Sequence, residues 1–215
     1  MKFEQLLAWV GNEPVFETGL LLAGDQDPGD VRRQLSRWVR AGKLYQLRRG
    51  LYALAPPFRK VIPHPFLVAN RLVPGSYVSR HAALAYFGLI PEYVALITSV
   101  SPGRPEQLTN PLGRFDYRHL RPELITGHRW VEVSAGQRAF VASPEKALLD
   151  LIYLQPGADA PEYLAELRLG QLEVLDSDEL RRLAEVFGKP KLARAVEEVV
   201  RIKEHEAEEY VVLSE

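Results

Sequence analysis

The stretch Asp27–Leu54, DPGDVRRQLSRWVRAGKLYQLRRGLYAL, decides the fold of the amino-terminal part of this 215-residue chain. Apolar residues recur there at helical spacing, which predicts a helix with one buried stripe. The stripe consists of Val31, Leu35, Trp38 and Val39. Two short apolar runs then flank Arg48-Arg49-Gly50, where glycine supplies the positive φ that a tight hairpin needs. The order of helix, turn and hairpin predicts a winged helix-turn-helix.

The two ends of this helix have recognisable signals. Asp27 is a candidate N-cap, and Pro28 fits the first helical position, where its missing N–H costs nothing. Asp30 falls at the third helical position, which is the place of the acid in a capping box. Gly42 follows the last turn and closes the helix. We therefore expect the helix to occupy the residues between Asp27 and Ala41.

Basic charge is concentrated in residues 31–60, which hold nine Lys and Arg residues and not one Asp or Glu, although the net charge of the chain is −1. A segment with so many basic residues and no acidic ones usually binds phosphate groups. A step of about 100° per residue places basic side chains opposite the buried stripe. The candidate DNA-binding residues are Arg32, Arg33, Ser36, Arg37, Arg40, Lys43, Arg48 and Arg49.

Two roles are expected within this set. In winged-helix docking, the face with Arg33 and Arg37 enters the major groove, while the wing reaches phosphate or the adjacent minor groove. Arg33 and Ser36 are the better candidates for reading bases. The expected phosphate anchors are Arg40, Lys43, Arg48 and Arg49. The alternative is that the charges only keep a surface helix soluble, but the second basic element that follows at once, without acids between, favours DNA binding.

Composition excludes several classes of protein. The chain contains no cysteine, which excludes disulfides, thiol catalysis and cysteine-ligated metal sites. Its apolar runs fall short of the ~20 residues of a membrane span, and its start lacks the apolar core of a signal peptide. We therefore expect a cytoplasmic protein without membrane contact. Residues 159–215 hold fifteen acidic and eight basic residues, which we interpret as a solvated helical surface.

The length of the chain favours one small and one larger domain. Four prolines in residues 55–65 exclude a helix or a central strand and predict a semi-rigid connection. We expect a winged domain over residues 1–56, a proline-rich linker over residues 57–65, and a larger mixed α/β domain over residues 66–215. The predicted fold class is α+β.

Further elements follow from apolar periodicity and turn residues. The expected helices cover Phe3–Val10, Phe16–Leu22, Phe66–Leu72, Ser79–Phe87, a helix that starts at Ser143-Pro144-Glu145, Pro161–Leu167, Ser177–Phe187 and Lys191–Glu208. The expected strands cover Ala95–Val100, Phe115–Leu120, Trp130–Val133 and Ala139–Ala142. The chain therefore ends in helices after a β-rich section.

The histidines and the acidic residues of the chain form no recognisable catalytic or metal-binding motif. The five histidines lack the spacing of a helical zinc site, although His119 and His128 could approach each other on neighbouring strands. Glu145, Lys146 and Asp150 offer acid–base groups, but Glu145 is explained by the helix start, and Asp150 lies about a turn and a half further on. We expect no cofactor, no bound metal and no enzymatic activity.

Three stretches resemble one known family. They are Val31–Leu44 running into Leu47–Leu54, the segment Tyr77–Leu89 (YVSRHAALAYFGL), and the segment Val141–Asp150 (VASPEKALLD). In this order they resemble the AbiEi-type antitoxins of bacterial type IV toxin–antitoxin systems, which act in abortive infection. The resemblance extends from the start of the chain to about residue 155.

The resemblance implies a two-part protein. Its amino-terminal domain would repress its own operon by binding inverted repeats in operator DNA, with the basic helix and wing as the DNA-contacting elements. Its carboxy-terminal domain would act as an antitoxin against a nucleotidyltransferase-like toxin encoded alongside. In type IV systems the antitoxin need not form a stable complex with the toxin, so the resemblance does not imply a toxin-binding surface.

Two other functions fit the residues. Residues 66–215 could form a small-molecule sensor that gates a generic winged-helix regulator, and a ligand-dependent change in DNA affinity would support it. Alternatively, the larger domain could be a nucleic-acid-processing enzyme that the winged domain guides. That enzyme would lose activity, without unfolding, when Glu145 or Asp150 is replaced.

Overall fold

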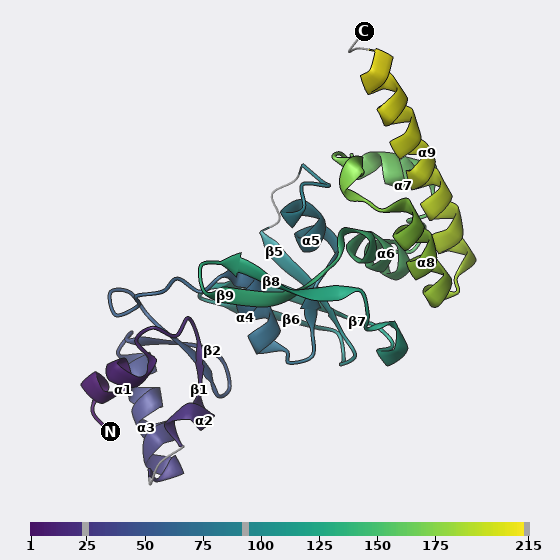
Figure 1. The fold of residues 1–215 in the computed structure, drawn as a ribbon. Helices are drawn as coiled ribbons and strands as arrows, with labels where there is room; N and C mark the ends of the chain where they lie inside the picture. Colours follow the sequence, from purple (N-terminus) through teal and green to yellow (C-terminus); the bar gives the residue numbers. More distant parts are fainter. Residues whose placement is uncertain (23–25, 92–94, 213–215) are drawn as a thin grey trace.

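The computed structural model describes residues 1–22, 26–91 and 95–212, with side chains as far as residue 206. A winged helix-turn-helix forms the amino-terminal end of the described chain (Figure 1). A six-stranded mixed sheet with its helices follows. The predicted α+β class is therefore confirmed.

The winged part contains three short strands and three helices. They are α1 (Phe3–Val10), β1 (Phe16–Glu17), α2 (Thr18–Leu21), α3 (Pro28–Arg40), β2 (Leu44–Arg48) and β3 (Leu51–Leu54). The strands form one antiparallel sheet in the order β1-β3-β2. The prediction of a helix over Phe16–Leu22 is wrong at its start, because Phe16 is extended and stacks on Tyr52 of β3, with ring centroids 5.9 Å apart. This stacking buries Phe16 and confines the helix to Thr18–Leu21.

The helix α3 begins as the sequence predicts. The Asp27 carboxylate accepts a hydrogen bond of 2.8 Å from the backbone N–H of Asp30, and Pro28 lies in the first turn. The sequence predicted Asp30 as the acid of a capping box. In the structure its carboxylate pairs with the Arg33 guanidinium instead. Val31, Leu35 and Trp38 are buried and Val39 is half-buried, as the predicted stripe requires. The stripe packs against residues of α1 and of the small sheet.

The larger sheet has the strand order β6-β7-β5-β4-β9-β8 and mixes parallel with antiparallel neighbours. Its strands are β4 (Tyr77–Val78), β5 (Leu96–Ser101), β6 (Glu106–Asn110), β7 (Gly113–His119), β8 (His128–Ser134) and β9 (Gln137–Ala142). The sequence predicts four of them but misses β4 and β6. The strand β4 is two residues long, and β6 is a mostly polar edge strand, so neither has a readable apolar pattern.

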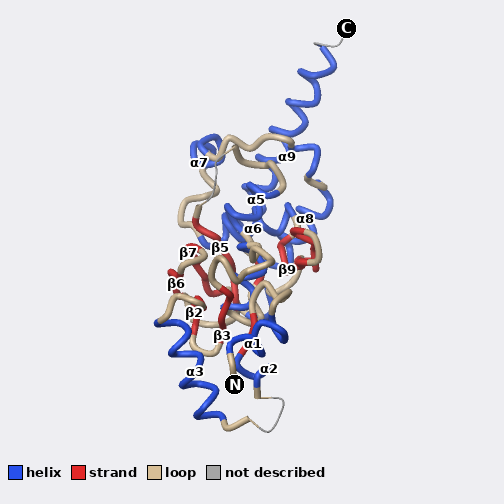
Figure 2. Tube along the Cα trace, turned by 90° about the vertical axis from the view of Figure 1, so that its left-hand side faces the viewer, coloured by secondary structure: helices blue, strands red, loops and turns tan. Residues whose placement is uncertain are grey.

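The structure describes six α-helices in the larger part, besides the short 3-10 helices Pro122–Leu124 and Leu172–Val174. They are α4 (Pro65–Leu72), α5 (Arg80–Tyr86), α6 (Pro144–Leu154), α7 (Pro161–Glu166), α8 (Ser177–Phe187) and α9 (Pro190–Val212). Each matches an expected helix. The helix α4 lies against the middle of the sheet, α5 packs on β5 and α6, and α8 and α9 pack on α6. In both the ribbon and the tube view, α7 and α9 lie at the end of the molecule away from α3 (Figures 1 and 2).

Hydrogen bonds at the linker and apolar contacts of the wing also connect the winged part to the larger part. The Gln137 side chain donates to the Ile62 carbonyl at 2.9 Å and accepts from the His64 N–H at 2.8 Å. Leu47 and Leu51 of the wing belong to the same apolar cluster as the core of the larger sheet. The division into domains at residues 57–65 stays a prediction, but the wing packs directly against the larger part.

Candidate nucleic-acid interface

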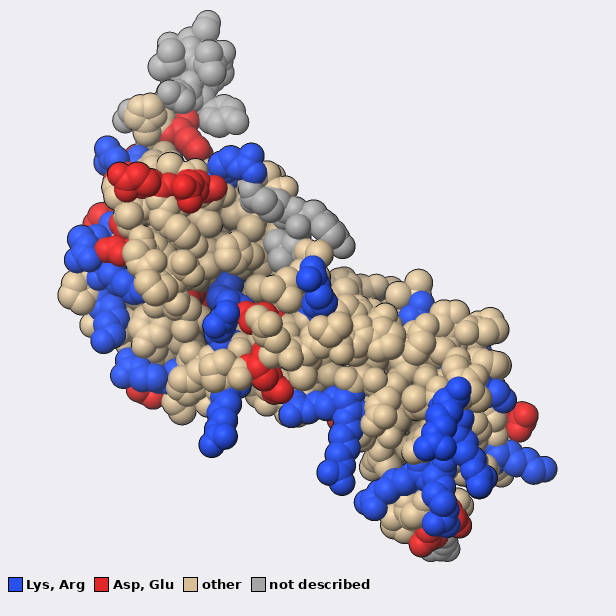
Figure 3. All heavy atoms as spheres, turned by 180° about the vertical axis from the view of Figure 1, so that it is seen from behind, with Lys and Arg blue, Asp and Glu red and all other residues tan. Residues whose placement is uncertain are grey.

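The exposed face of α3 is basic. Its 13 residues begin at Pro28 and end at Arg40, and the buried stripe forces the remaining side chains outward. The exposed basic and hydroxyl side chains of this face are those of Arg32, Arg33, Ser36, Arg37 and Arg40. Seen from behind, Lys and Arg side chains gather over the amino-terminal part of the molecule, at the lower right (Figure 3). The structure thus brings together five of the eight predicted DNA-binding residues on one helix face.

Arg33 has a carboxylate partner on this face. Its guanidinium pairs with Asp30 one turn earlier, and both side chains are about two-thirds exposed, at 67% and 64%. A pair so exposed contributes little to stability, typically about 0–1 kcal/mol. A phosphate or a base edge can therefore replace Asp30 as the partner of Arg33 at small cost.

The wing is a hairpin whose tip consists of Arg49 and Gly50. Gly50 has a φ of +85°, which L side chains rarely adopt, and this left-handed residue closes the turn. Its carbonyl accepts a hydrogen bond of 2.9 Å from the Thr18 N–H, which ties the tip to the start of α2. Arg49 is exposed. The sequence places both Arg48 and Arg49 at the tip, but the structure puts only Arg49 in the turn, because Arg48 is the last residue of β2 and pairs with Leu51.

Arg48 lies next to the tip, but its side chain turns toward the larger part of the molecule. Its Nη1 donates to the Leu72 carbonyl at 2.6 Å and lies 3.5 Å from a carboxylate oxygen of Glu106. The sequence does not predict these contacts, because Leu72 and Glu106 are distant along the chain. Arg48 therefore joins the wing to α4 and β6.

Lys43 has a structural contact as well. Its ammonium lies over the ring of Phe3 at 4.6 Å from the centroid and 5.9 Å from that of Phe58. Such cation–π contacts hold a cation beside an aromatic face. Lys43 is half-buried at the end of α3, in a position that also stabilises the winged core.

The acid–base groups of α6 are enclosed in the larger part. The Lys146 ammonium and the Asp150 carboxylate form an ion pair, and both side chains are 0% exposed. Asp150 also accepts hydrogen bonds from Tyr77 at 3.0 Å and Ser79 at 2.7 Å. Glu145 accepts from the Asp176 N–H at 3.0 Å and so fixes the start of α8. No substrate can reach Lys146 or Asp150 in this fold, so these groups serve its packing.

His119 and His128, which could have lain on neighbouring strands, are far apart in the sheet. His119 lies at the end of β7 and His128 at the start of β8, and β5, β4 and β9 separate these strands. The two side chains therefore do not approach each other, because the chain inserts three other strands between them. His128 stacks on Tyr77 with ring centroids 4.5 Å apart, and burial lowers the pKa of its imidazole.

Residues 1–22, 26–91 and 95–206 contain no group of three or more His, Asp or Glu side chains able to hold a metal ion. Within the part of the chain that the structure describes, no helix is both long and apolar enough to cross a membrane.

Comparison with known proteins identifies the winged segment. Residues 25–55 match the family model described as a transcriptional regulator, AbiEi antitoxin. The matched range contains α3, β2 and β3, which together form the helix and wing. No curated protein matches the chain. The resemblance of residues 77–89 and 141–150 stays a prediction. Over residues 25–55, the helix and wing of this chain are similar to those of AbiEi antitoxin transcriptional regulators.

Proposed function

We propose that the protein is a DNA-binding autorepressor in which α3 enters the major groove of its operator. The observation that supports this proposal is the basic exposed face of α3, which presents Arg33, Ser36 and Arg37 and whose one acid, Asp30, lies in the first turn. Helix side chains at these positions reach base edges, and Arg and Ser are base-reading residues. Arg32, Arg40 and Lys43 flank this face and would contact phosphate.

The second half of the proposed function is antitoxicity. It rests on the family match of the winged segment, whose members are described as antitoxin transcriptional regulators. We propose a nucleotidyltransferase-like toxin as the functional partner, without a stable complex, and inverted repeats upstream of the protein's own operon as the DNA target. The protein would act in the cytoplasm, where this DNA lies. The proposal contains no catalytic step.

A mobility-shift titration tests the repressor. The full chain is mixed with duplex DNA from immediately upstream of its own gene, at physiological salt and with excess unrelated competitor. We expect a complex at protein concentrations that leave a shuffled duplex unbound. Equal binding to both duplexes would mean that the basic face binds phosphate without sequence preference, which would contradict the proposed repressor. Antitoxicity is tested separately, by growth of cells that express the adjacent toxin with and without this chain.

The neighbours Arg48 and Arg49 provide a matched test of the wing. Each phosphate contact contributes about 0.9 to the slope of log K against log salt. Because Arg49 is exposed and Arg48 is held by Leu72 and Glu106, Arg49→Ala should flatten the slope by about one unit, whereas Arg48→Ala should leave it unchanged. The measurement is operator affinity over a series of salt concentrations. A flatter slope for Arg48→Ala would mean that its contacts with the larger part break on DNA.

A further inference from the structure

The larger part contains a cavity of about 400 Å³ that the sequence did not reveal. Ligand sites usually have volumes of about 300–1,000 Å³. The lining residues are Arg80, His81, Pro105, Arg118, His119, Leu151, Leu154, Gln155 and Pro156. Four of these nine residues are Arg or His, and none of the nine is acidic. One wall of the cavity is therefore cationic, and another, from α6, is apolar.

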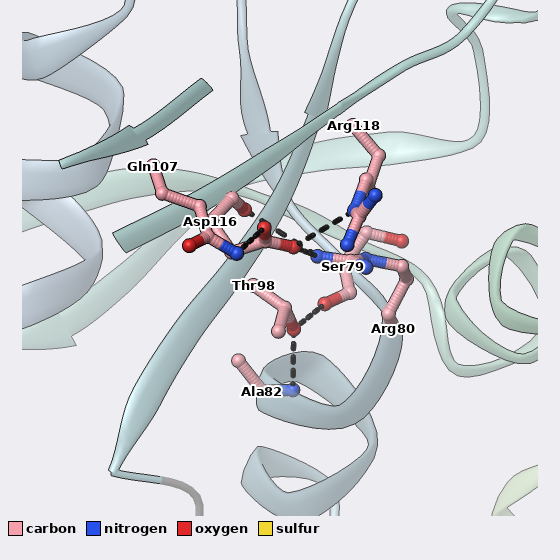
Figure 4. A network of polar contacts seen from close by, with 7 residues as sticks. All are labelled: Ser79, Arg80, Ala82, Thr98, Gln107, Asp116 and Arg118. Atoms are coloured by element: carbon pink, nitrogen blue, oxygen red, sulfur yellow. Dashed lines mark hydrogen bonds and ion pairs between the residues drawn. The ribbon is translucent and has the colours of Figure 1, made fainter. Parts of the chain in front are cut away.

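The two arginines of the cavity are fixed through one buried carboxylate. Asp116 of β7 accepts a hydrogen bond from the Gln107 amide at 3.0 Å and pairs with the Arg80 guanidinium. The Nε of Arg118 lies 3.3 Å from the same carboxylate. Figure 4 shows Asp116 between Gln107 on one side and the two arginines on the other. Asp116 thus holds two guanidinium groups side by side.

The charge of this cluster is unbalanced. Burial tends to raise the pKa of Asp116, but the hydrogen bonds from Arg80 and Gln107 and the charges of both arginines outweigh it, so the pKa lies below its usual value. Asp116 is therefore a carboxylate at neutral pH. One negative charge faces two guanidinium groups, which stay protonated in proteins. The cluster has a net positive charge at the cavity wall.

Arg80 has two further features of a ligand-binding residue. Its φ of +57° lies in the left-handed region, which costs a non-glycine residue of order 1–3 kcal/mol. Its Nε is buried and has no hydrogen-bond partner among the residues that the structure describes. Thr98 holds this strained start of α5, since its hydroxyl donates to the Ser79 carbonyl at 2.7 Å and accepts from the Ala82 N–H at 3.0 Å (Figure 4).

The outer groups of the cavity are accessible. The Arg118 side chain is 51% exposed, so it can turn part of its guanidinium to a ligand while Nε stays near Asp116. His119 is exposed, and its Nδ1 donates to the Gly103 carbonyl at 3.0 Å, which orients the ring and leaves Nε2 as its other polar atom. A planar guanidinium beside an imidazole suits the oxygen atoms of phosphate.

We propose that this cavity binds a small phosphate ester of the nucleotide class. The phosphate would lie against Arg118 and His119, with Arg80 behind them. The apolar body of the ligand would pack on Leu151, Leu154 and the neighbouring prolines, which a free inorganic anion would leave uncovered. This site is separate from the α3 face, so the proposal does not depend on operator binding.

Isothermal titration calorimetry of the full chain with AMP, ADP and ATP tests the site. We expect one nucleotide per chain to bind, and Arg118→Gln and His119→Gln each to weaken binding by about tenfold or more, because a hydrogen bond to a charged group is lost. Arg114→Gln is the matched control, since Arg114 is an exposed residue of the same strand outside the cavity. It should bind like the unchanged chain. Melting temperatures verify that each variant is folded. If Arg118→Gln does not fold, His119→Gln alone tests the site.

Three outcomes would overturn the proposal. The first is no heat of binding with any of the three nucleotides. The second is binding that an Arg33→Gln/Arg37→Gln variant loses and the cavity variants keep, which would place the nucleotide on α3. The third is that a single-stranded oligonucleotide binds in an Arg118-dependent way, whereas mononucleotides do not bind. This outcome would make the cavity part of a nucleic-acid surface.

Discussion

Replacing Lys146 by Met is expected to lower the free energy of unfolding by about 3–5 kcal/mol, a large part of the stability of a domain. Lys146 and Asp150 lie one turn apart on α6 and are completely enclosed. Removing the ammonium leaves the Asp150 carboxylate buried without a cation. The hydrogen bonds from Tyr77 and Ser79 stay in place, but they do not neutralise its charge.

Burial works against both charges of this pair. It raises the pKa of Asp150 and lowers that of Lys146, and the attraction between them, with the hydrogen bonds to Asp150, only partly opposes it. Burial and the nearby carboxylate also raise the pKa of Tyr77, which therefore stays a hydrogen-bond donor at neutral pH. The pair is stable as a unit, and the loss of one member is costly.

A second variant isolates the charge. In Lys146→Met/Asp150→Asn the amide oxygen still accepts from Tyr77 and Ser79, but no charge is buried, so we expect at least half of the lost stability to return. Lys189→Met removes an exposed lysine and should change stability by less than ~0.5 kcal/mol. Urea unfolding measures all three. The explanation is refuted if the double variant is no more stable than Lys146→Met.

Local features of the fold could be predicted from the sequence. The start of α3 was predictable to the residue, because its cap, its first-turn proline and its apolar spacing all lie close together along the chain. The α-helices described in the larger part were also predicted from the sequence, but its two 3-10 helices, Pro122–Leu124 and Leu172–Val174, were not. The partial failure among the α-helices, at Phe16, came from a ring contact with Tyr52, a residue of a different strand.

Features that depend on distant contacts could not be predicted. Arg48 looks like a free basic residue in the sequence, and only its contacts with Leu72 and Glu106 show that it joins the wing to the larger part. The cavity likewise combines the Arg80 region with Arg118 and α6, which come together through the order of strands in the sheet. Lys146 and Asp150 stood out in the sequence only as possible acid–base groups, and neither their ion pair nor its burial was predicted.

Replacing both Arg33 and Arg37 by Ala should weaken operator binding by about 30-fold or more and remove most of the preference for the operator over a shuffled duplex. Two base contacts, each contributing ~1–3 kcal/mol, account for this loss. Both side chains are exposed, and the Asp30 partner of Arg33 lies on the surface, so the variant should fold normally. The measurement is a mobility-shift titration with both duplexes at one salt concentration.

The matched control for this variant is Arg181→Ala/Arg182→Ala. It removes the same charge from α8, at the other end of the molecule from α3, where the two arginines pair with Glu197 and Glu179 on the surface (Figure 1). If only total charge matters, both double variants will weaken binding to operator and shuffled duplex alike. If α3 reads bases, only the Arg33/Arg37 variant will lose the difference between the two duplexes, because phosphate contacts position the protein and base contacts specify the sequence.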